Sequence, residues 1–206
     1  MVSAPKGPAG RPRGFDTEEA LEQAVRVFWS QGYEGASLEE LTRAMGITRT
    51  SMYRAFGNKE ALFRTALQRY TRTTASYVVQ AVERPTAREV AVAFLHGAAC
   101  ATTQPGHPVG CLGVQGALAT GTSARWSQDV LAEWREQGTA HLQARFERAV
   151  DDGDLPGGVD CRLLACYLMT VSNGIAVQAA GGTPRTELMA VADVALHPWP
   201  PVPGGG

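Results

Sequence analysis

The sequence has little that would suit a secreted, membrane-spanning or cofactor-dependent protein. Its four cysteines show no CxxC spacing, so structural disulfides are not expected. The first fourteen residues lack the apolar core of a signal peptide, and no later run is expected to span a bilayer. There is no Gly-rich phosphate loop, no HExxH motif and no convincing strand pattern. These absences predict a cytoplasmic, all-α protein with no membrane partner, no cofactor and no metal site.

Charge is balanced overall and uneven along the chain. The formal net charge is −1, with 44% hydrophobic and 19% charged residues, which is typical of a folded protein. The first 70 residues hold ten Lys/Arg against eight Asp/Glu, and the remainder holds nine against twelve. Nucleic-acid binding requires cations only where phosphates lie, so this mild asymmetry is compatible with DNA contacts near the N-terminus.

Capping residues and apolar periodicity predict about nine helices. Capping boxes begin at Asp16, Ser37 and Thr86, and side chains that cap single helices stand at Thr48, Asn58, Ser123 and Asp160. The expected helices span 16–32, 37–46, 49–56, 58–85, 86–104, 109–120, 123–150, 160–181 and 183–196. Pro85 is expected to end the long fourth helix.

The same pattern divides the chain into four parts. We expect a flexible basic arm at 1–14, a helix-turn-helix domain at 15–57, a helical regulatory and dimerisation domain at 58–196, and a disordered tail at 197–206 rich in Pro and Gly.

The second and third helices, joined by a turn at Gly46, form a helix-turn-helix. Such a pair presents the first turns of its second helix to the DNA major groove. Arg49 suits bidentate contact with guanine, and Thr48 and Thr50 suit bases or phosphate. The sequence also offers three side chains for phosphate contact: Ser37, Tyr53 and Lys59. On these residues alone, a polar surface turn between core helices explains the pattern equally well.

The run from Gly32 to Phe63, GYEGASLEELTRAMGITRTSMYRAFGNKEALF, closely resembles the signature of the tetracycline-repressor (TetR) family. Its last set, Y-x-x-F-x-x-K-x-x-L, is filled by Tyr53, Phe56, Lys59 and Leu62. The resemblance implies an all-helical homodimer with a variable C-terminal ligand domain. It also implies backbone contacts from Ser37, Tyr53 and Lys59, and base contacts from Thr48, Arg49, Thr50 and Arg54, of which the long cation Arg54 is less typical.

Two further cations lie in the N-terminal arm. Arg11 and Arg13, in the segment Gly10-Arg-Pro-Arg-Gly14, suit insertion into a minor groove, as basic arms do in other DNA-binding proteins. Solubilising charge on a flexible end is an equally good explanation of both residues.

The last two predicted helices offer a dimer interface. A two-fold dimer matches a palindromic operator, in which half-sites lie about one helical turn apart. The interface candidates are Leu164, Leu168, Val171, Ile175, Leu188, Val191, Ala192 and Ala195. Cys166, Thr170 and Gly174 form a second, small-residue face, and the alternative is that both faces belong to the core of one chain.

The effector pocket is expected among helices four to eight, where the family diverges. Aromatic and polar side chains suggest a lining of Tyr77, Phe94, His96, Cys111, Gln115, Trp126, Trp134, Tyr167, Met169 and Asn173. Each of these residues has an alternative place in the core or on the surface.

The sequence therefore favours a ligand-released repressor of a palindromic operator, with an unknown small-molecule effector. Cys111, expected near a helix N-terminus, leaves open a thiol-based redox, electrophile or metal-responsive regulator. A remoter alternative is an enzyme that uses Cys111 with His107 or His96, although no third orienting group accompanies them.

Overall fold

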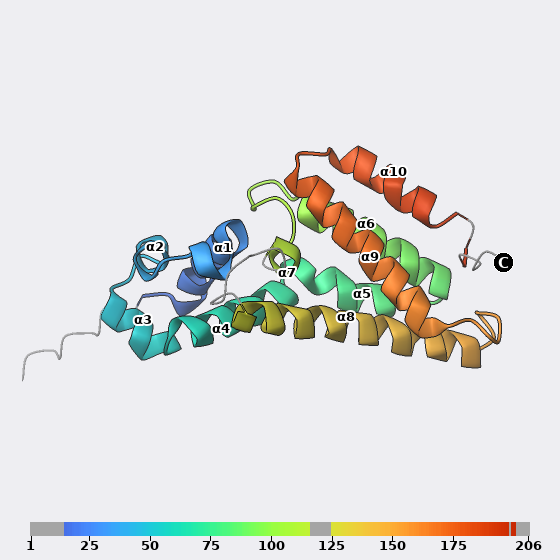
Figure 1. Cartoon of the computed structure of the whole chain (residues 1–206), viewed down its shortest axis with the longest axis horizontal. Coiled ribbons are helices and arrows are strands. Elements are labelled where there is room, and N and C mark those ends of the chain that lie inside the picture. Colours follow the sequence, from blue (N-terminus) through green and yellow to red (C-terminus); the bar gives the residue numbers. More distant parts are fainter. Residues whose placement is uncertain (1–14, 116–124, 198, 201–206) are drawn as a thin grey trace, which may run out of the picture.

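The computed structural model describes residues 15–115, 125–197 and 199–200, and within them it is all-helical, with ten α-helices and one 3₁₀ turn. The helices are α1 Thr17–Gly35, α2 Leu38–Ala44, α3 Arg49–Phe56, α4 Lys59–Arg72, η1 Thr74–Ser76, α5 Tyr77–Val82, α6 Ala87–Thr102, α7 Leu112–Gln115, α8 Arg125–Asp151, α9 Cys161–Ala180 and α10 Arg185–Ala195. The molecule is elongated: α1 to α3 gather at one end, α4 leads away from them, and α6, α8, α9 and α10 form the rest (Figure 1).

The predicted caps determine where helices begin. Ser37 and Thr86 complete capping boxes with Glu40 and Glu89, in which cap side chain and third helical residue satisfy each other's backbone N–H groups. Single side-chain caps are present at the predicted positions Thr48, Asn58 and Asp160. Asp16, predicted as a capping box, is also a single cap: its carboxylate accepts from Glu18 and Glu19 N–H, without a reciprocal bond from the Glu19 side chain. The predicted cap Ser123 lies outside the described residues.

Two glycines with positive φ shape the N-terminal helices. Gly32 has φ 70° and kinks α1 where the helix was expected to end. Gly46 has φ 65° and follows Met45, the C-cap of α2, which allows the chain to turn into α3. Both conformations lie in the left-handed region that L side chains rarely adopt, so both turns depend on glycine.

The prediction of one long fourth helix that ends at Pro85 is wrong. The chain leaves α4 at Thr73, where φ is −109° and ψ −87°, and continues as η1 and α5. At the break, the backbone N–H and the hydroxyl of Ser76 both donate to Thr73 O, which closes a 3₁₀ turn in place of the next α-helical hydrogen bond. The described residues therefore contain one helix more than the nine expected.

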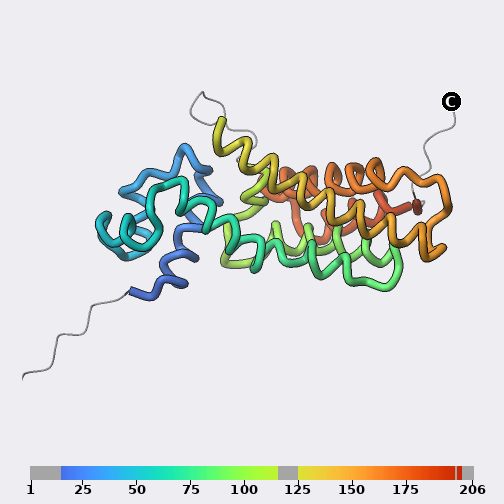
Figure 2. The backbone as a smooth tube through the Cα atoms, turned by 90° about the horizontal axis from the view of Figure 1, so that it is seen from below, coloured from blue at the N-terminus to red at the C-terminus, as the bar shows by residue number. Residues whose placement is uncertain are grey.

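Two buried clusters stabilise the fold, and the first crosses the boundary predicted after residue 57. It joins Phe28 and Trp29 of α1 to Phe63 and Tyr70 of α4, and it continues into α7 and α8. The second cluster holds α6, α8, α9 and α10 together. Helix α4 packs on α1, and its buried residues share a cluster with residues of α7 and α8. It therefore connects the two ends of the molecule (Figure 2).

Arg145, buried on α8, fixes the turn between α5 and α6. Its guanidinium donates to the carbonyl oxygens of Val82, Arg84 and Pro85 at 3.2, 2.9 and 2.8 Å. These carbonyls include the ones that the end of α5 leaves without helical partners. A buried guanidinium with three acceptors is well satisfied, so this contact anchors the cavity-bearing half of the molecule.

Helix α9 corrects the expectation that no run can span a bilayer. It spans 20 residues, Cys161–Ala180, and an 18-residue window of it has a mean hydropathy of 1.4, so it is long and apolar enough to cross a membrane by length and composition alone. In this fold, α9 instead packs against α6, α8 and α10 as a central helix. Its apolar side chains at Leu164, Leu168 and Ile175 are buried in the chain, whereas those at Leu163 and Val177 are exposed.

One residue of the tail packs, contrary to the expectation of disorder from 197 onward. The Trp199 ring lies 6.2 Å from the Phe146 ring, between centroids, and is partly buried against the second cluster. The large apolar surface of an indole favours burial even in a Pro-rich segment.

Candidate functional site

The α3 helix presents a polar, acid-free face to solvent. Met52 is fully buried and fixes the helix against the core, while Arg49, Thr50, Tyr53 and Arg54 are exposed, with Tyr53 at 46%. None of the eight residues of α3 is acidic. This face therefore combines two guanidinium groups with hydroxyl groups, which suits base edges and phosphates.

Two residues predicted to contact DNA, Ser37 and Thr48, are also the N-caps of α2 and α3. Thr48 Oγ1 accepts the backbone N–H of Ser51 at 3.1 Å, and Ser37 Oγ accepts that of Glu40 at 3.1 Å. Hydrogen bonds from the Ser37 side chain and backbone lower the pKa of Glu40, so a carboxylate stands at the start of α2. Both hydroxyl groups remain on the surface, but their first role is to set the orientation of α2 and α3.

Lys59 is less free than its sequence position indicates. Its Nζ lies 4.4 Å from the centroid of the Tyr33 ring, and burial lowers its pKa. Tyr33 in turn packs on Phe63 and Trp126 at 5.2 and 5.0 Å between ring centroids. A phosphate contact from Lys59 would thus be made by an ammonium group held at the first turn of α4. Arg11 and Arg13 lie outside the described residues.

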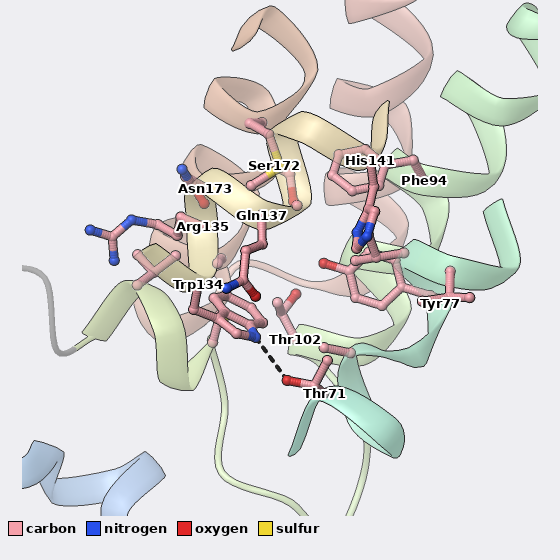
Figure 3. A pocket seen from close by; sticks show the side chains of 18 residues that line it. Thr71, Tyr77, Phe94, Thr102, Trp134, Arg135, Gln137, His141, Ser172 and Asn173 are labelled. Atoms are coloured by element: carbon pink, nitrogen blue, oxygen red, sulfur yellow. Dashed lines mark hydrogen bonds between the residues drawn. The ribbon is translucent and has the colours of Figure 1, made fainter. Parts of the chain in front are cut away.

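A cavity of about 80 Å³ lies between the end of α4 and helices α5, α6, α8 and α9 (Figure 3). Six of the ten predicted pocket residues line it: Tyr77, Phe94, Cys111, Trp134, Met169 and Asn173. The aromatic walls and the few polar groups between them are typical of a small-molecule site.

The other four predicted pocket residues lie elsewhere because each has a closer partner. His96 pairs with Asp193 at 2.8 Å, and Gln115 donates to Val109 O at 3.0 Å. Tyr167 donates to Ala195 O at 2.6 Å and so joins α9 to α10. Trp126 packs on Tyr33 and Phe63 of the N-terminal end, and Arg64 lies over its ring.

Several residues that line the cavity were not predicted, although the helical periodicity of α8 could have identified some of them. On α8, Trp134, Gln137, Gly138 and His141 follow the i, i+3, i+4, i+7 spacing of a single helix face. The remaining missed polar residues of the lining are Thr71, Thr102, Arg135 and Ser172.

Polar groups in the cavity are largely neutral or engaged. Burial raises the pKa of Tyr77, whose phenol is hydrogen-bonded to Ser172, so it stays protonated. Arg135 donates to Gly113 O at 2.5 Å, and its guanidinium points away from Tyr77 (Figure 3). Among the described lining residues there is no Asp or Glu.

Cys111 lies between the cavity and the N-terminal end. It precedes α7, is 8% exposed, and its sulfur accepts a hydrogen bond of 3.3 Å from the Tyr70 hydroxyl. Burial raises the pKa of this thiol, so proximity to a helix N-terminus does not yield the reactive thiolate that was considered. The two candidate histidines have other partners: the His107 ring lies 6.0 Å from that of Trp29, and His96 pairs with Asp193.

The predicted dimer residues split into a buried and an exposed set. Five of them are intrachain core, contrary to their assignment: Leu164, Leu168, Ile175, Leu188 and Ala192 are at most 4% exposed. Val171 and Ala195 are half-buried, and Val191 is 47% exposed. The outward face instead carries further large apolar side chains at Leu163, Val177 and Val194, of which Val194 is 74% exposed. The small residues Thr170 and Gly174 are exposed on α9.

Comparisons with known proteins agree with this geometry. Residues 20–66 match the model described as "Bacterial regulatory proteins, tetR family". The chain is 31% identical over 194 residues to the HTH-type transcriptional repressor ComR of Escherichia coli K12, covering 93% of this chain and 92% of that one. A solved cysteine mutant of the TetR family regulator CifR, complexed with 26-base-pair operator DNA, is 40% identical, with a TM-score of 0.87 over 92% of this chain and 100% of CifR.

The chain therefore belongs to the TetR family: it is a helix-turn-helix transcriptional repressor that binds operator DNA, and not an enzyme. The predicted family, all-helical class and regulatory function are confirmed. FadR of Bacillus subtilis, solved with stearoyl-CoA, shares the fold at 15% identity, with a TM-score of 0.67 over 88% of this chain and 96% of FadR.

Proposed function

We propose that two copies of the chain bind a palindromic operator in the cytoplasm and leave it when a small molecule occupies the cavity. The observation that carries this proposal is the acid-free face of α3, held outward by buried Met52 and capped by Thr48. Residues 15–57 then act as the reading unit, and 58–196 as the sensing and pairing unit. Arg49 reads a guanine, and Tyr53 and Lys59 bind phosphate.

The homodimer is supported by the apolar surface of α9 and α10. Leu163, Val177, Val191 and Val194 are each 47% exposed or more, and they lie on helices whose other faces are already buried in the chain. Large exposed apolar side chains on two helices that pack on each other favour association. An isologous interface with this face on both subunits gives the two-fold symmetry that a palindrome requires.

Coupling between cavity and DNA is supported by the position of α4. Thr71 of α4 lines the cavity, and Tyr70 beside it contacts both Cys111 and Trp29 of α1. The loop before α7 is also tied to α1, because Arg26 donates to Gly106 O at 2.6 Å. A ligand that prefers one arrangement of α4 would change the spacing of the two α3 helices, which weakens operator binding.

The experiment is selection of bound sequences from a random DNA library by the purified chain. We expect a palindrome whose half-sites are separated by about one helical turn of DNA. A variant with Arg49→Ala and Tyr53→Phe should enrich no such sequence, while Arg88→Ala, on the exposed side of α6, should enrich the same palindrome. Failure of the folded wild type to enrich any sequence would contradict the proposed operator.

A second candidate is regulation through Cys111, favoured by the contact of this cavity-lining thiol with Tyr70 of α4. In that case a thiol-reactive compound would release the operator from wild type but not from Cys111→Ser. Because burial raises the pKa of Cys111, we expect iodoacetamide at neutral pH to label the half-buried Cys100 and Cys166 first. Preferential labelling of Cys111 would favour the thiol mechanism over reversible binding.

A further inference from the structure

We infer that the effector is a small, uncharged molecule whose hydrogen-bond acceptor takes the indole N–H of Trp134 from Thr71, so that one group both recognises the ligand and signals to α4. This inference rests on the proposed ligand-released repressor and adds to it the chemical class of the ligand and the residue that reports its presence.

The size of the cavity limits the ligand. An engineered apolar cavity of about 150 Å³ in another protein holds benzene. The cavity here measures about 80 Å³, roughly half as much, and therefore suits a ligand of roughly three to five non-hydrogen atoms. At the ceiling of about −1.5 kcal/mol per non-hydrogen atom, so small a ligand reaches a dissociation constant between about 5 × 10⁻⁴ and 3 × 10⁻⁶ M at best, so binding is tested at up to millimolar concentrations.

The lining disfavours charged ligands of either sign. No described lining residue is Asp or Glu, so a cation would find no counter-ion. The guanidinium of Arg135 is engaged by Gly113 O and points away from Tyr77 (Figure 3). His141 lines the cavity beside Tyr77, but its side chain is exposed to solvent, so it is not a buried counter-ion. Transfer of a charge from water into such a site without a partner is costly, so an uncharged molecule fits best.

Trp134 stands where the cavity meets α4. Its Nε1–H donates to Thr71 Oγ1 at 2.8 Å, while the Thr71 hydroxyl donates to Leu67 O at 2.8 Å (Figure 3). Thr71 is the one α4 residue in the described lining. The indole ring packs directly on Gly113, where any side chain would overlap it, so the ring has little room to shift toward α7.

The same pair separates the cavity from the outside. A surface groove between α4 and α8 shares Thr71, Trp134 and Gln137 with the cavity. A ligand that enters from this groove must pass the hydrogen bond between Trp134 and Thr71. An acceptor on the ligand can replace the Thr71 oxygen at Trp134. This removes the hydrogen bond from α8 to Thr71 in the last turn of α4, while the ring contact between Tyr70 and Trp134 remains.

The test combines binding and signalling in the full-length protein. Butanone is the probe. Three control compounds each change one property: propanoate is of similar size but anionic, chloropropane lacks the carbonyl oxygen, and dibutyl ketone is too large for the cavity. Indole N–H resonances of ¹⁵N-labelled protein report binding, and the Trp134 resonance is assigned by its loss in Trp134→Phe. We expect butanone to shift the Trp134 resonance and to lower operator affinity, with weaker effects from the three matched compounds.

Thr71→Val separates recognition from signalling. Without the competing oxygen, butanone should bind several-fold tighter, yet it should lower operator affinity less than in wild type. Thr65→Val is the matched control, because Thr65 also lies on α4 and its hydroxyl bonds only to Ala61 O in the described structure. This variant should match wild type in both measurements.

The inference is overturned if no uncharged probe shifts the Trp134 resonance, if propanoate or dibutyl ketone does so at lower concentration, or if Thr71→Val behaves like wild type. If the wild-type protein does not bind the operator even without a probe, the proposed function is contradicted instead. The indole spectrum needs no DNA, so the two failures are distinguishable.

Discussion

The hydroxyl of Tyr70 on α4 donates a hydrogen bond of 3.3 Å to the sulfur of Cys111, just before α7. The ring of Tyr70 also packs edge-on against Trp29 of α1, with 5.0 Å between centroids. One buried side chain thus contacts the N-terminal helix and the wall of the cavity. Arg69, its neighbour, pairs with Glu22 at 2.8 Å and with Glu18 and fixes α4 to α1.

Tyr70→Phe should lower the free energy of unfolding by about 1 kcal/mol, because the ring packing is kept and one buried hydrogen bond is lost. Urea unfolding followed by circular dichroism measures the change. Tyr53→Phe is the matched control: Tyr53 is 46% exposed, so its stability should stay within about 0.5 kcal/mol of wild type. Equal stability of the two variants would show that the hydroxyl of Tyr70 contributes nothing.

Stability should fall at alkaline pH because burial raises the pKa of both Cys111 and Tyr70. A raised pKa in the folded state means that the stabilising contribution is present below the ordinary pKa and is lost as pH rises toward the folded value. The decline should begin near pH 9, the ordinary pKa of the thiol. Unfolding measured from neutral pH upward should decline less steeply in Cys111→Ala, and identical slopes would exclude Cys111 as a source.

Arg145→Met should destabilise the fold by about 2–4 kcal/mol, since three carbonyl oxygens lose their charged donor while the apolar stem is roughly kept. Thermal and urea unfolding give the value. Arg88→Met changes an exposed arginine on α6 and should cost less than about 0.5 kcal/mol. A cost for Arg145→Met as small as that of the control would contradict its anchoring role.

Val191→Glu should convert the dimer to a monomer at micromolar concentration, because it places a charge in the proposed α9–α10 interface. Analytical ultracentrifugation measures the mass. Val109→Glu provides the control, since Val109 is similarly exposed, at 51%, but lies in the loop between α6 and α7. A monomeric wild type, or a dimer unaffected by Val191→Glu, would place the interface elsewhere.

Local chemistry made much of the fold predictable. Side chains such as Ser37 and Asn58 cap backbone N–H groups within three residues, so the helix starts can be predicted from the sequence. The turn at Gly46, which has a positive φ, can be predicted in the same way. Contacts between residues far apart in the sequence could not be predicted in this way. Trp126 was assigned to the pocket on its size alone, yet its place is fixed by Tyr33, more than 90 residues away in the sequence.

The dimer face shows the same limit. Apolar periodicity on α9 identified Leu164 and Leu168 as a contact stripe, but periodicity cannot say which stripe faces the chain's own α6 and which faces a partner. The pocket was partly predictable for a related reason: Trp134 was identified by its aromatic side chain, while Thr71, which accepts its N–H, lies 63 residues away in the sequence and was not connected with it.

Titration of the selected operator with wild type and Arg49→Ala, at several salt concentrations, tests the central claim most directly. Wild type should bind the operator at least about 10³-fold more tightly than scrambled DNA, with a steep salt dependence. Arg49→Ala should lose about 1–3 kcal/mol on the operator and relax specificity at one base pair of each half-site. Equal affinity of wild type for operator and scrambled DNA, or an unchanged Arg49→Ala, would contradict sequence reading by α3.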